Sequence, residues 1–266
     1  MNVLVDRSRG FKRFWSSAAN FHARRPRCNI FGLAFALLLA CPGTVIADEA
    51  SYQKTKPGAD GIGKSYMGRE IAGVMGWQAA GWLERTERIQ EERPDLLLAE
   101  LKLKPGMVVA DIGAGSGYHT RRMAEVIGKT GKVYAVDVQP QMVQMLSAFA
   151  REARYSNVRP ILSTIDDVKL PANSVDLAIM VDVYHELEYP LEVMRSVVKA
   201  LKPGGKVAFV EYRAEDANVP IKALHKMSEA QIKREAAGHA LEWVRTSNVL
   251  PWQHIVFFRK LVLSSQ

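Results

Sequence analysis

The chain is almost free of cysteine: only Cys28 and Cys41 occur among its 266 residues. Both lie before residue 48, so the rest of the chain has no thiol. A disulfide, a thiolate metal site and a cysteine nucleophile are therefore excluded from that larger part.

A strong charge of either sign is also missing from most of the chain. The net charge of +8 is concentrated in residues 1–47, which hold seven basic residues and one acidic residue. The remainder has 29 basic and 27 acidic side chains. It lacks the strongly basic character typical of nucleic-acid-binding domains, and we expect no nucleic-acid partner.

The apolar run near the N-terminus is short. Residues 30–40 are eleven apolar or small residues without a charge, whereas a membrane-spanning helix needs ~20. A basic stretch that ends at Arg27 precedes the run, and small residues suited to signal peptidase end at Ala47. We predict that residues 1–47 are a signal peptide or membrane anchor, and that the protein is periplasmic or membrane-anchored in the cell envelope.

Four alternatives for this leader remain open. Residues 38–41, Leu-Leu-Ala-Cys, resemble a lipoprotein processing box, and Arg24-Arg25 weakly resembles a twin-arginine signal. An uncleaved leader would associate the protein with a membrane through residues 1–47. A start codon placed too early would instead leave the protein in the cytoplasm.

The rest of the chain divides into three predicted parts. Residues 48–65 are polar and rich in Gly and Lys, which indicates a linker. Residues 66–103 have a helical pattern, with Pro94-Asp95 at a helix start, and are expected to form an N-terminal helical cap. Residues 104–266 are expected to form the main domain.

The main domain alternates short apolar runs with amphipathic segments. The predicted strands are residues 107–112, 132–137, 158–162, 174–183, 206–211, 242–247 and 254–261. The predicted helices are residues 118–127, 141–153, 191–201 and 228–237. This alternation predicts an α/β fold in which helices cover both faces of a mostly parallel sheet.

A glycine-rich turn joins the first predicted strand to the first helix. Its sequence from residue 111 is Asp-Ile-Gly-Ala-Gly-Ser-Gly, with Gly113, Gly115 and Gly117 in alternate positions. Glycines at this point permit a tight turn and the close approach of a ligand to the backbone. A dinucleotide-binding loop would need glycine at position 118, where Tyr118 stands. The spacing therefore argues against a nicotinamide cofactor.

Further carboxylates and turns follow at informative positions. Asp137, followed by Val138, ends the second strand, where a carboxylate can bind ribose hydroxyls. Asp166-Asp167 precede Leu-Pro, and Leu-Lys-Pro-Gly-Gly occupies residues 201–205. Asp137 could instead be a solvated strand-end residue, and the two aspartates could simply cap a turn.

These motifs, in this order over residues 105–212, resemble those of class I S-adenosylmethionine-dependent methyltransferases. The chain looks closest to predicted bacterial members of unassigned substrate. The resemblance implies a Rossmann-like, doubly wound sheet of seven strands with the last strand antiparallel, and S-adenosylmethionine as cofactor. Asp111 would supply negative charge for the cofactor's ammonium group. The cofactor-binding residues that the resemblance implies are Asp111, Gly113, Gly115, Gly117, Asp137, Val138, Asp166 and Asp182.

The same resemblance implies that an acceptor, expected to be a small molecule, lies at residues 182–185 and 211–213. His185 is the candidate general base because imidazole titrates near neutral pH, and Tyr184 is a candidate substrate contact. Alternatively, His185 merely hydrogen-bonds a helix end. The aromatic rings of Tyr66, Trp77 and Trp82 could cover the sulfonium, or Trp82 could only pack the cap.

No metal site is expected from the spacing of histidines. His119, His225 and His254 are scattered, without the pair four residues apart that a helical metal site uses. Two other functions remain as alternatives: a non-catalytic module that senses S-adenosylmethionine or S-adenosylhomocysteine, and a nicotinamide-dependent oxidoreductase, which Tyr118 disfavours.

Overall fold

The computed structural model describes residues 52–262 of the chain. The predicted leader, residues 1–47, lies outside the described residues. Within residues 52–262, no helix combines the length and the apolar character that crossing a membrane requires.

The centre of the fold is a seven-stranded β-sheet with the order β6-β5-β4-β7-β8-β10-β9. Its strands are β4 (Val108–Ile112), β5 (Lys132–Asp137), β6 (Val158–Leu162), β7 (Val175–Val181), β8 (Leu201–Tyr212), β9 (Leu241–Ser247) and β10 (Gln253–Lys260). The strands from β6 to β8 in this order are parallel, and β10 is antiparallel to both of its neighbours. The predicted mostly parallel sheet with an antiparallel last strand is confirmed.

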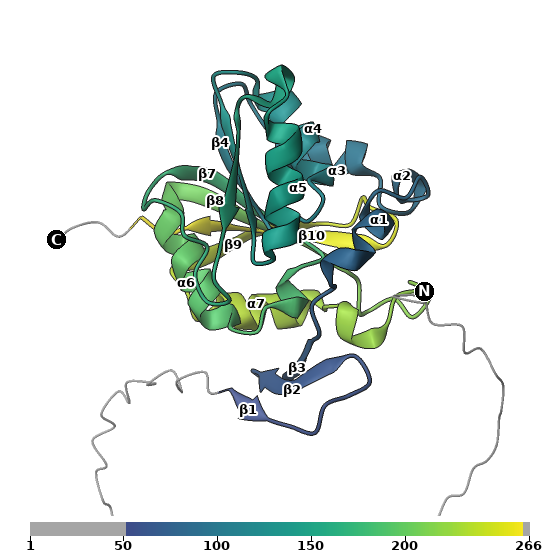
Figure 1. Cartoon of the computed structure of the whole chain (residues 1–266). Helices are drawn as coiled ribbons and strands as arrows, with labels where there is room; N and C mark the ends of the chain where they lie inside the picture. Colours follow the sequence, from purple (N-terminus) through teal and green to yellow (C-terminus); the bar gives the residue numbers. More distant parts are fainter. Residues whose placement is uncertain (1–51, 263–266) are drawn as a thin grey trace, which may run out of the picture. The chain divides into compact units, whose positions relative to one another are not determined.

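Helices cover both faces of the sheet (Figure 1). They are α3 (Pro94–Leu101), α4 (Tyr118–Ile127), α5 (Pro140–Ala150), α6 (Pro190–Ala200) and α7 (Glu229–Ala236), with short 3-10 turns η2 (Ala153–Tyr155), η3 (Tyr184–Glu186) and η4 (Ala223–His225). Buried side chains of α3, α4 and α5 pack on one face, and those of α6 and α7 on the other. This is the predicted doubly wound, Rossmann-like α/β fold.

Local sequence sets both the helix starts and the strand faces. Pro94, Pro140 and Pro190 each stand in the first turn of a helix, where the fixed φ of proline favours the helix and its missing N–H costs nothing. Along β8, consecutive apolar residues from Val207 to Val210 alternate between the two core clusters. A strand buried on both faces must be apolar throughout, and each such side chain contributes about 1.5–3 kcal/mol by its burial.

The N-terminal part differs from the prediction. A three-stranded antiparallel sheet is formed by β1 (Gln53–Lys54), β2 (Gly61–Tyr66) and β3 (Arg69–Ala72). The predicted linker up to residue 65 and the predicted helix from residue 66 are therefore wrong over these strands. Met67 and Gly68 both have positive φ, as a two-residue hairpin turn requires. Helical turns begin only at η1 (Trp77–Ala79), followed by α1 (Ala80–Leu83) and α2 (Arg88–Glu91).

The N-terminal sheet is joined to the main domain by a buried ion pair. The guanidinium of Arg69 in β3 donates to both carboxylate oxygens of Glu235 in α7, at 2.8 and 3.0 Å. It also donates to the backbone carbonyl of His185, at 3.0 Å. One side chain thus connects β3, α7 and the turn η3, which follows β7 at the carboxyl edge of the sheet.

Candidate active site

A cavity of about 220 Å³ lies at the carboxyl ends of the parallel strands. In the sheet, β5 and β6 lie on one side of β4, and β7 and β8 lie on the other, so the chain order of the strands reverses here. Open α/β sheets bind their ligands at such a point. The residues of the sheet edge that line the cavity include Gly113, Gly115, Asp137, Val138, Asp182, Val183, His185, Glu186 and Tyr212. The N-terminal part adds Ala72, Val74, Met75, Trp82, Leu83 and Arg88. The cavity is therefore formed by both parts of the chain.

The glycine-rich turn packs too closely for side chains. Gly113, Gly115 and Gly117 have φ of +69°, +54° and +85°. A Cβ on Gly113 would lie 2.5 Å from Val183, and one on Gly115 would lie 2.7 Å from Leu83. The turn therefore combines left-handed backbone with close contacts, and only glycine meets both conditions without strain. Gly113 and Gly115 line the cavity, whereas Gly117 does not line it and is the N-cap of α4.

Asp137 lies at the end of β5 with its carboxylate at the cavity wall. One oxygen accepts from the backbone N–H of Gly115 at 2.9 Å, and the other from that of Gln139 at 2.9 Å. Burial raises the pKa of Asp137, and these backbone donors oppose the rise. A carboxylate has about four lone-pair directions, so Asp137 retains the capacity to accept from a ligand.

Asp111 does not line the cavity, contrary to its predicted place at the ligand-binding mouth. Its side chain is buried behind the glycine turn and accepts from the hydroxyl of Thr120 at 2.5 Å. Burial raises its pKa to about 6, which the Thr120 hydrogen bond and the charge of Arg88 partly oppose. Asp111 is thus a carboxylate of the domain interior, separate from the ligand-facing groups.

Asp182 faces the cavity directly after β7, with a left-handed φ of +54°. Oδ2 accepts from the side-chain amide of Gln253 at 2.7 Å. Oδ1 is buried and has no hydrogen-bond partner among the described residues. Burial raises the pKa of Asp182 well above its usual range, and the charges of Glu92 and Glu211 add to the rise. A buried acceptor with a free oxygen favours a bound cationic or hydrogen-bond-donating group.

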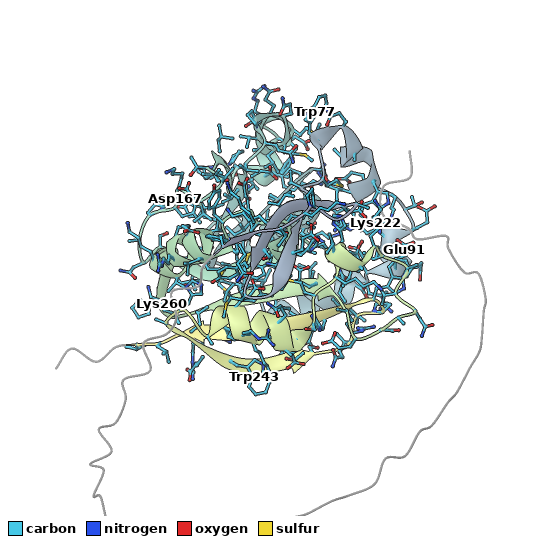
Figure 2. The ribbon with its side chains drawn as sticks, turned by 90° about the horizontal axis from the view of Figure 1, so that it is seen from below. Trp77, Glu91, Asp167, Lys222, Trp243 and Lys260 are labelled. Carbon is cyan, nitrogen blue, oxygen red and sulfur yellow. The ribbon has the colours of Figure 1, made fainter. Side chains whose placement is uncertain are left out.

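Two other predicted residues do not line the cavity, although Thr164 and Ile165 beside Asp166 do. Asp166 is exposed and accepts from the hydroxyl of Thr164 at 2.7 Å, and the neighbouring Asp167 lies at the periphery of the molecule (Figure 2). Tyr184 is 1% exposed, and its ring packs edge-on against Phe209 in the core. Tyr184 therefore supports the sheet edge from within, and the geometry does not support its predicted contact with substrate.

His185 brings a polar group into the cavity beyond Asp182. Its Nδ1 lies 2.6 Å from Oε2 of the fully buried Glu211, and its Nε2 lies 3.1 Å from Nδ1 of His225. Burial lowers the pKa of His185, but the charge and hydrogen bond of Glu211 raise it further, so the net shift is upward. The Glu211 carboxylate accepts from Nδ1–H, so Nε2 keeps a lone pair and faces Nδ1 of His225.

Glu186 and His225 complete this polar group, although the histidine spacing indicated no such cluster. Oε1 of Glu186 lies 3.4 Å from Nδ1 of His225 and 3.8 Å from Nε2 of His185. The expectation that His225 stands apart from other candidate ligands is wrong, because η3 and η4 place it beside His185. No periodic signal in the sequence relates residues that are forty positions apart.

The aromatic residues of the N-terminal part differ in whether they line the cavity. Trp82 lines the cavity, and its ring stacks on the guanidinium of Arg85 at 3.5 Å. Tyr66 is buried in the N-terminal part and Trp77 is 38% exposed, and neither lines the cavity. Of the three predicted lid aromatics, Trp82 alone is placed where it could cover a ligand.

Comparison with known proteins assigns the chain to a family. The model of a methyltransferase domain matches residues 103–254, more than half of the chain. The chain belongs to the class I S-adenosylmethionine-dependent methyltransferases. The chain is similar to a solved S-adenosylmethionine-dependent methyltransferase from Aquifex aeolicus, with 26% identity and a TM-score of 0.66 over 71% of this chain and 100% of that one.

Curated methyltransferases match shorter parts of it. A protein-L-isoaspartate O-methyltransferase of Methanothrix thermoacetophila is 45% identical over 62 residues, which are 23% of this chain and 30% of that protein. The ubiquinone/menaquinone biosynthesis C-methyltransferase UbiE of Ectopseudomonas mendocina is 26% identical over 111 residues, which are 41% and 43% of the two chains. The chain thus spans less than half of either relative, and neither match carries an acceptor over to it.

The cavity residues of the chain fit the cofactor of its family. The glycine turn leaves backbone exposed at the wall, where a Cβ would have no room. Asp137 presents acceptor oxygens suited to ribose hydroxyls, and Asp182 presents the unpartnered Oδ1. Arg88, a buried cation at the same cavity, was not singled out by the sequence pattern.

Proposed function

We propose that this protein transfers a methyl group from S-adenosylmethionine to a small-molecule acceptor. One observation carries the proposal: a single cavity is lined both by Asp137 and the glycine turn and by His185, Glu186 and His225. The first group suits a nucleoside, and the second suits a polar acceptor. Asp137 ends β5, whereas His185 and Glu186 follow β7 and His225 follows β8, so donor and acceptor would meet above β4 and β7.

The donor would be held by groups that the fold fixes in advance. Asp137 would accept from the ribose hydroxyls, with apolar contacts from Val138 and Met142 beside it. Asp182 would accept from the ammonium group through Oδ1, the role that the sequence pattern had suggested for Asp111. The bound donor supplies an electrophilic methyl group.

The acceptor would be small because residues of the N-terminal part form part of the cavity wall and so limit the space for an acceptor. Met75, Trp82 and Leu83 contribute to its wall, and Arg69 ties this part to the backbone of His185. His185 would bind and activate the acceptor through Nε2, with Glu211 fixing the orientation of the ring. Holding the acceptor in line with the methyl group can supply most of the rate.

The test incubates the full-length protein with S-adenosylmethionine and a small-molecule extract of its source cells, and measures S-adenosylhomocysteine and methylated products by mass spectrometry. The proposal expects both products, and expects them to be lost with Asp137→Ala. If S-adenosylhomocysteine and methylated products form only with the macromolecular fraction of the cells, the proposal of a small-molecule acceptor is contradicted. Binding of S-adenosylhomocysteine without product from any fraction would favour the sensor alternative.

We also propose that residues 1–47 direct the protein to the cell envelope, on the sequence features of that segment. A reporter fused after Ala47 should fractionate with the envelope, and the same reporter without residues 1–47 should stay in the cytoplasm. Cytoplasmic recovery of both fusions would contradict the proposal.

A further inference from the structure

We infer that His185, Glu186 and His225 form a binding site for a divalent transition-metal ion, of the kind that zinc occupies. The inference concerns the acceptor side of the cavity, and only its catalytic meaning rests on the proposed function. Two imidazoles and one carboxylate form a ligand set found in catalytic zinc sites, which keep a further position open. All three side chains line the cavity.

The separations of the three ligand atoms fit one ion. Nε2 of His185, Nδ1 of His225 and Oε1 of Glu186 are separated by 3.1, 3.4 and 3.8 Å. In the plane of the three atoms, the point equidistant from them lies about 2.0 Å from each. This distance is the length of a zinc–nitrogen or zinc–oxygen bond. The atoms therefore already stand at ligand spacing.

Other groups hold the ligands in this orientation. Glu211 accepts from Nδ1–H of His185, so that Nε2 of His185 carries the lone pair that a metal needs. The backbone N–H of Met75 donates to Oε2 of Glu186 at 3.2 Å, which leaves Oε1 to face the histidines. Carboxylates that orient metal-bound histidines are typical of such sites.

The surroundings also suit a cation. Glu186 lines the acceptor side of the cavity and the buried Glu211 contacts His185 there, so a divalent ion would balance their negative charge. His185 and His225 are 1% and 6% exposed, so a bound ion would be shielded from bulk water. Two nitrogen ligands favour zinc, cobalt, iron, nickel or copper over magnesium and calcium, which prefer oxygen.

Three protein ligands leave a coordination position toward the cavity. The acceptor would then be a small molecule whose oxygen or nitrogen can coordinate the ion, and His185 would act on it as a ligand of the metal. This inference narrows the class of acceptor to metal-binding compounds, such as those with hydroxyl or phenol groups.

The test uses the full-length chain, purified without a histidine tag and freed of metal with EDTA. Titration with Co²⁺ should give one equivalent of bound ion with the visible absorption of a four- or five-coordinate site, and Zn²⁺ should displace it. Mg²⁺ should not compete. Glu211→Gln should weaken Co²⁺ binding by roughly 10–100-fold, the usual cost of losing a carboxylate that orients a metal ligand. His225→Ala and Glu186→Gln each remove a ligand itself and should weaken Co²⁺ binding roughly a hundredfold or more.

His239→Ala is the matched control, since His239 is a half-buried histidine outside the cluster. It should bind Co²⁺ as the unsubstituted chain does. Binding of S-adenosylhomocysteine is measured on every variant, which shows that the cavity is folded and tests the proposed function separately. A chain that binds S-adenosylhomocysteine but not Co²⁺, or that retains Co²⁺ affinity in both ligand variants, would overturn the metal site and leave the proposed function intact.

Discussion

The guanidinium of Arg69 lies 2.8 Å from the carboxylate of Glu235, and their side chains are only 10% and 0% exposed. The two residues belong to β3 and α7, so this pair joins the N-terminal sheet to the main domain. Because Arg69 also donates to the carbonyl of His185, the pair fixes the turn that carries the candidate acceptor-binding residues.

Removal of one partner should leave a buried charge without compensation. Arg69→Met is expected to lower the free energy of unfolding by about 3–5 kcal/mol. The double variant Arg69→Met/Glu235→Leu should recover much of this loss because neither charge remains buried. Chemical denaturation measures both values. Arg154→Met, which breaks the exposed pair with Glu152, serves as the control and should leave stability unchanged. If Arg69→Met and Arg154→Met both lower the free energy of unfolding by the same small amount, the anchoring role of Arg69 is contradicted.

Gly117 should tolerate alanine much less well than Gly68 does. The two glycines have almost the same φ, +85° and +86°, but a Cβ on Gly117 would lie 2.3 Å from the ring of Phe149, whereas one on Gly68 would meet nothing within 4 Å. Gly68→Ala should therefore cost only the left-handed strain of about 1–2 kcal/mol. Gly117→Ala should add about 1–3 kcal/mol of overpacking and weaken S-adenosylhomocysteine binding. Thermal unfolding with and without ligand distinguishes the two, and equal costs would contradict the packing described.

Local pattern predicted the main domain well because its elements depend on neighbouring residues. The strand of β5 and the helix α4 match their predicted bounds, since apolar runs and helical periodicity are short-range signals. The hairpin of β2 and β3 was missed because Met67-Gly68 is a weaker turn signal than Asn-Gly. The cluster of His185 and His225 was missed because only the folded chain brings the two together.

The buried carboxylate of Asp111 should make stability depend on pH. Burial raises its pKa from about 4 to about 6, so ionisation of Asp111 opposes folding by an amount that grows from about pH 4 and is complete above about pH 6. Asp111→Asn removes this cost and can still accept from Thr120. The variant should be more stable than the unsubstituted chain by about 1–3 kcal/mol at pH 8, and the gain should disappear as the pH falls toward 4. Urea denaturation at both pH values is the measurement, and a gain that is independent of pH would be the contrary result.

Asp137 and Asp166 should differ in their effect on ligand affinity. Asp137 lines the cavity, whereas Asp166 is exposed and bonded to Thr164. Asp137→Ala should weaken S-adenosylhomocysteine binding by ~1.5–3 kcal/mol, roughly ten- to a hundredfold, because charge-assisted bonds to the ribose would be lost. Asp166→Ala should leave the dissociation constant unchanged. A similar loss in both variants, measured by calorimetry, would place the adenosine elsewhere.

The most direct test of the account compares two nucleotide ligands on the same protein. Calorimetry on the full-length chain should detect binding of S-adenosylhomocysteine at one site and no binding of NAD. The reason is the turn of Gly113, Gly115 and Gly117, in which Tyr118 replaces the last glycine of a dinucleotide-binding loop. Binding of NAD without binding of S-adenosylhomocysteine would contradict the assignment of this cavity to a methyl donor.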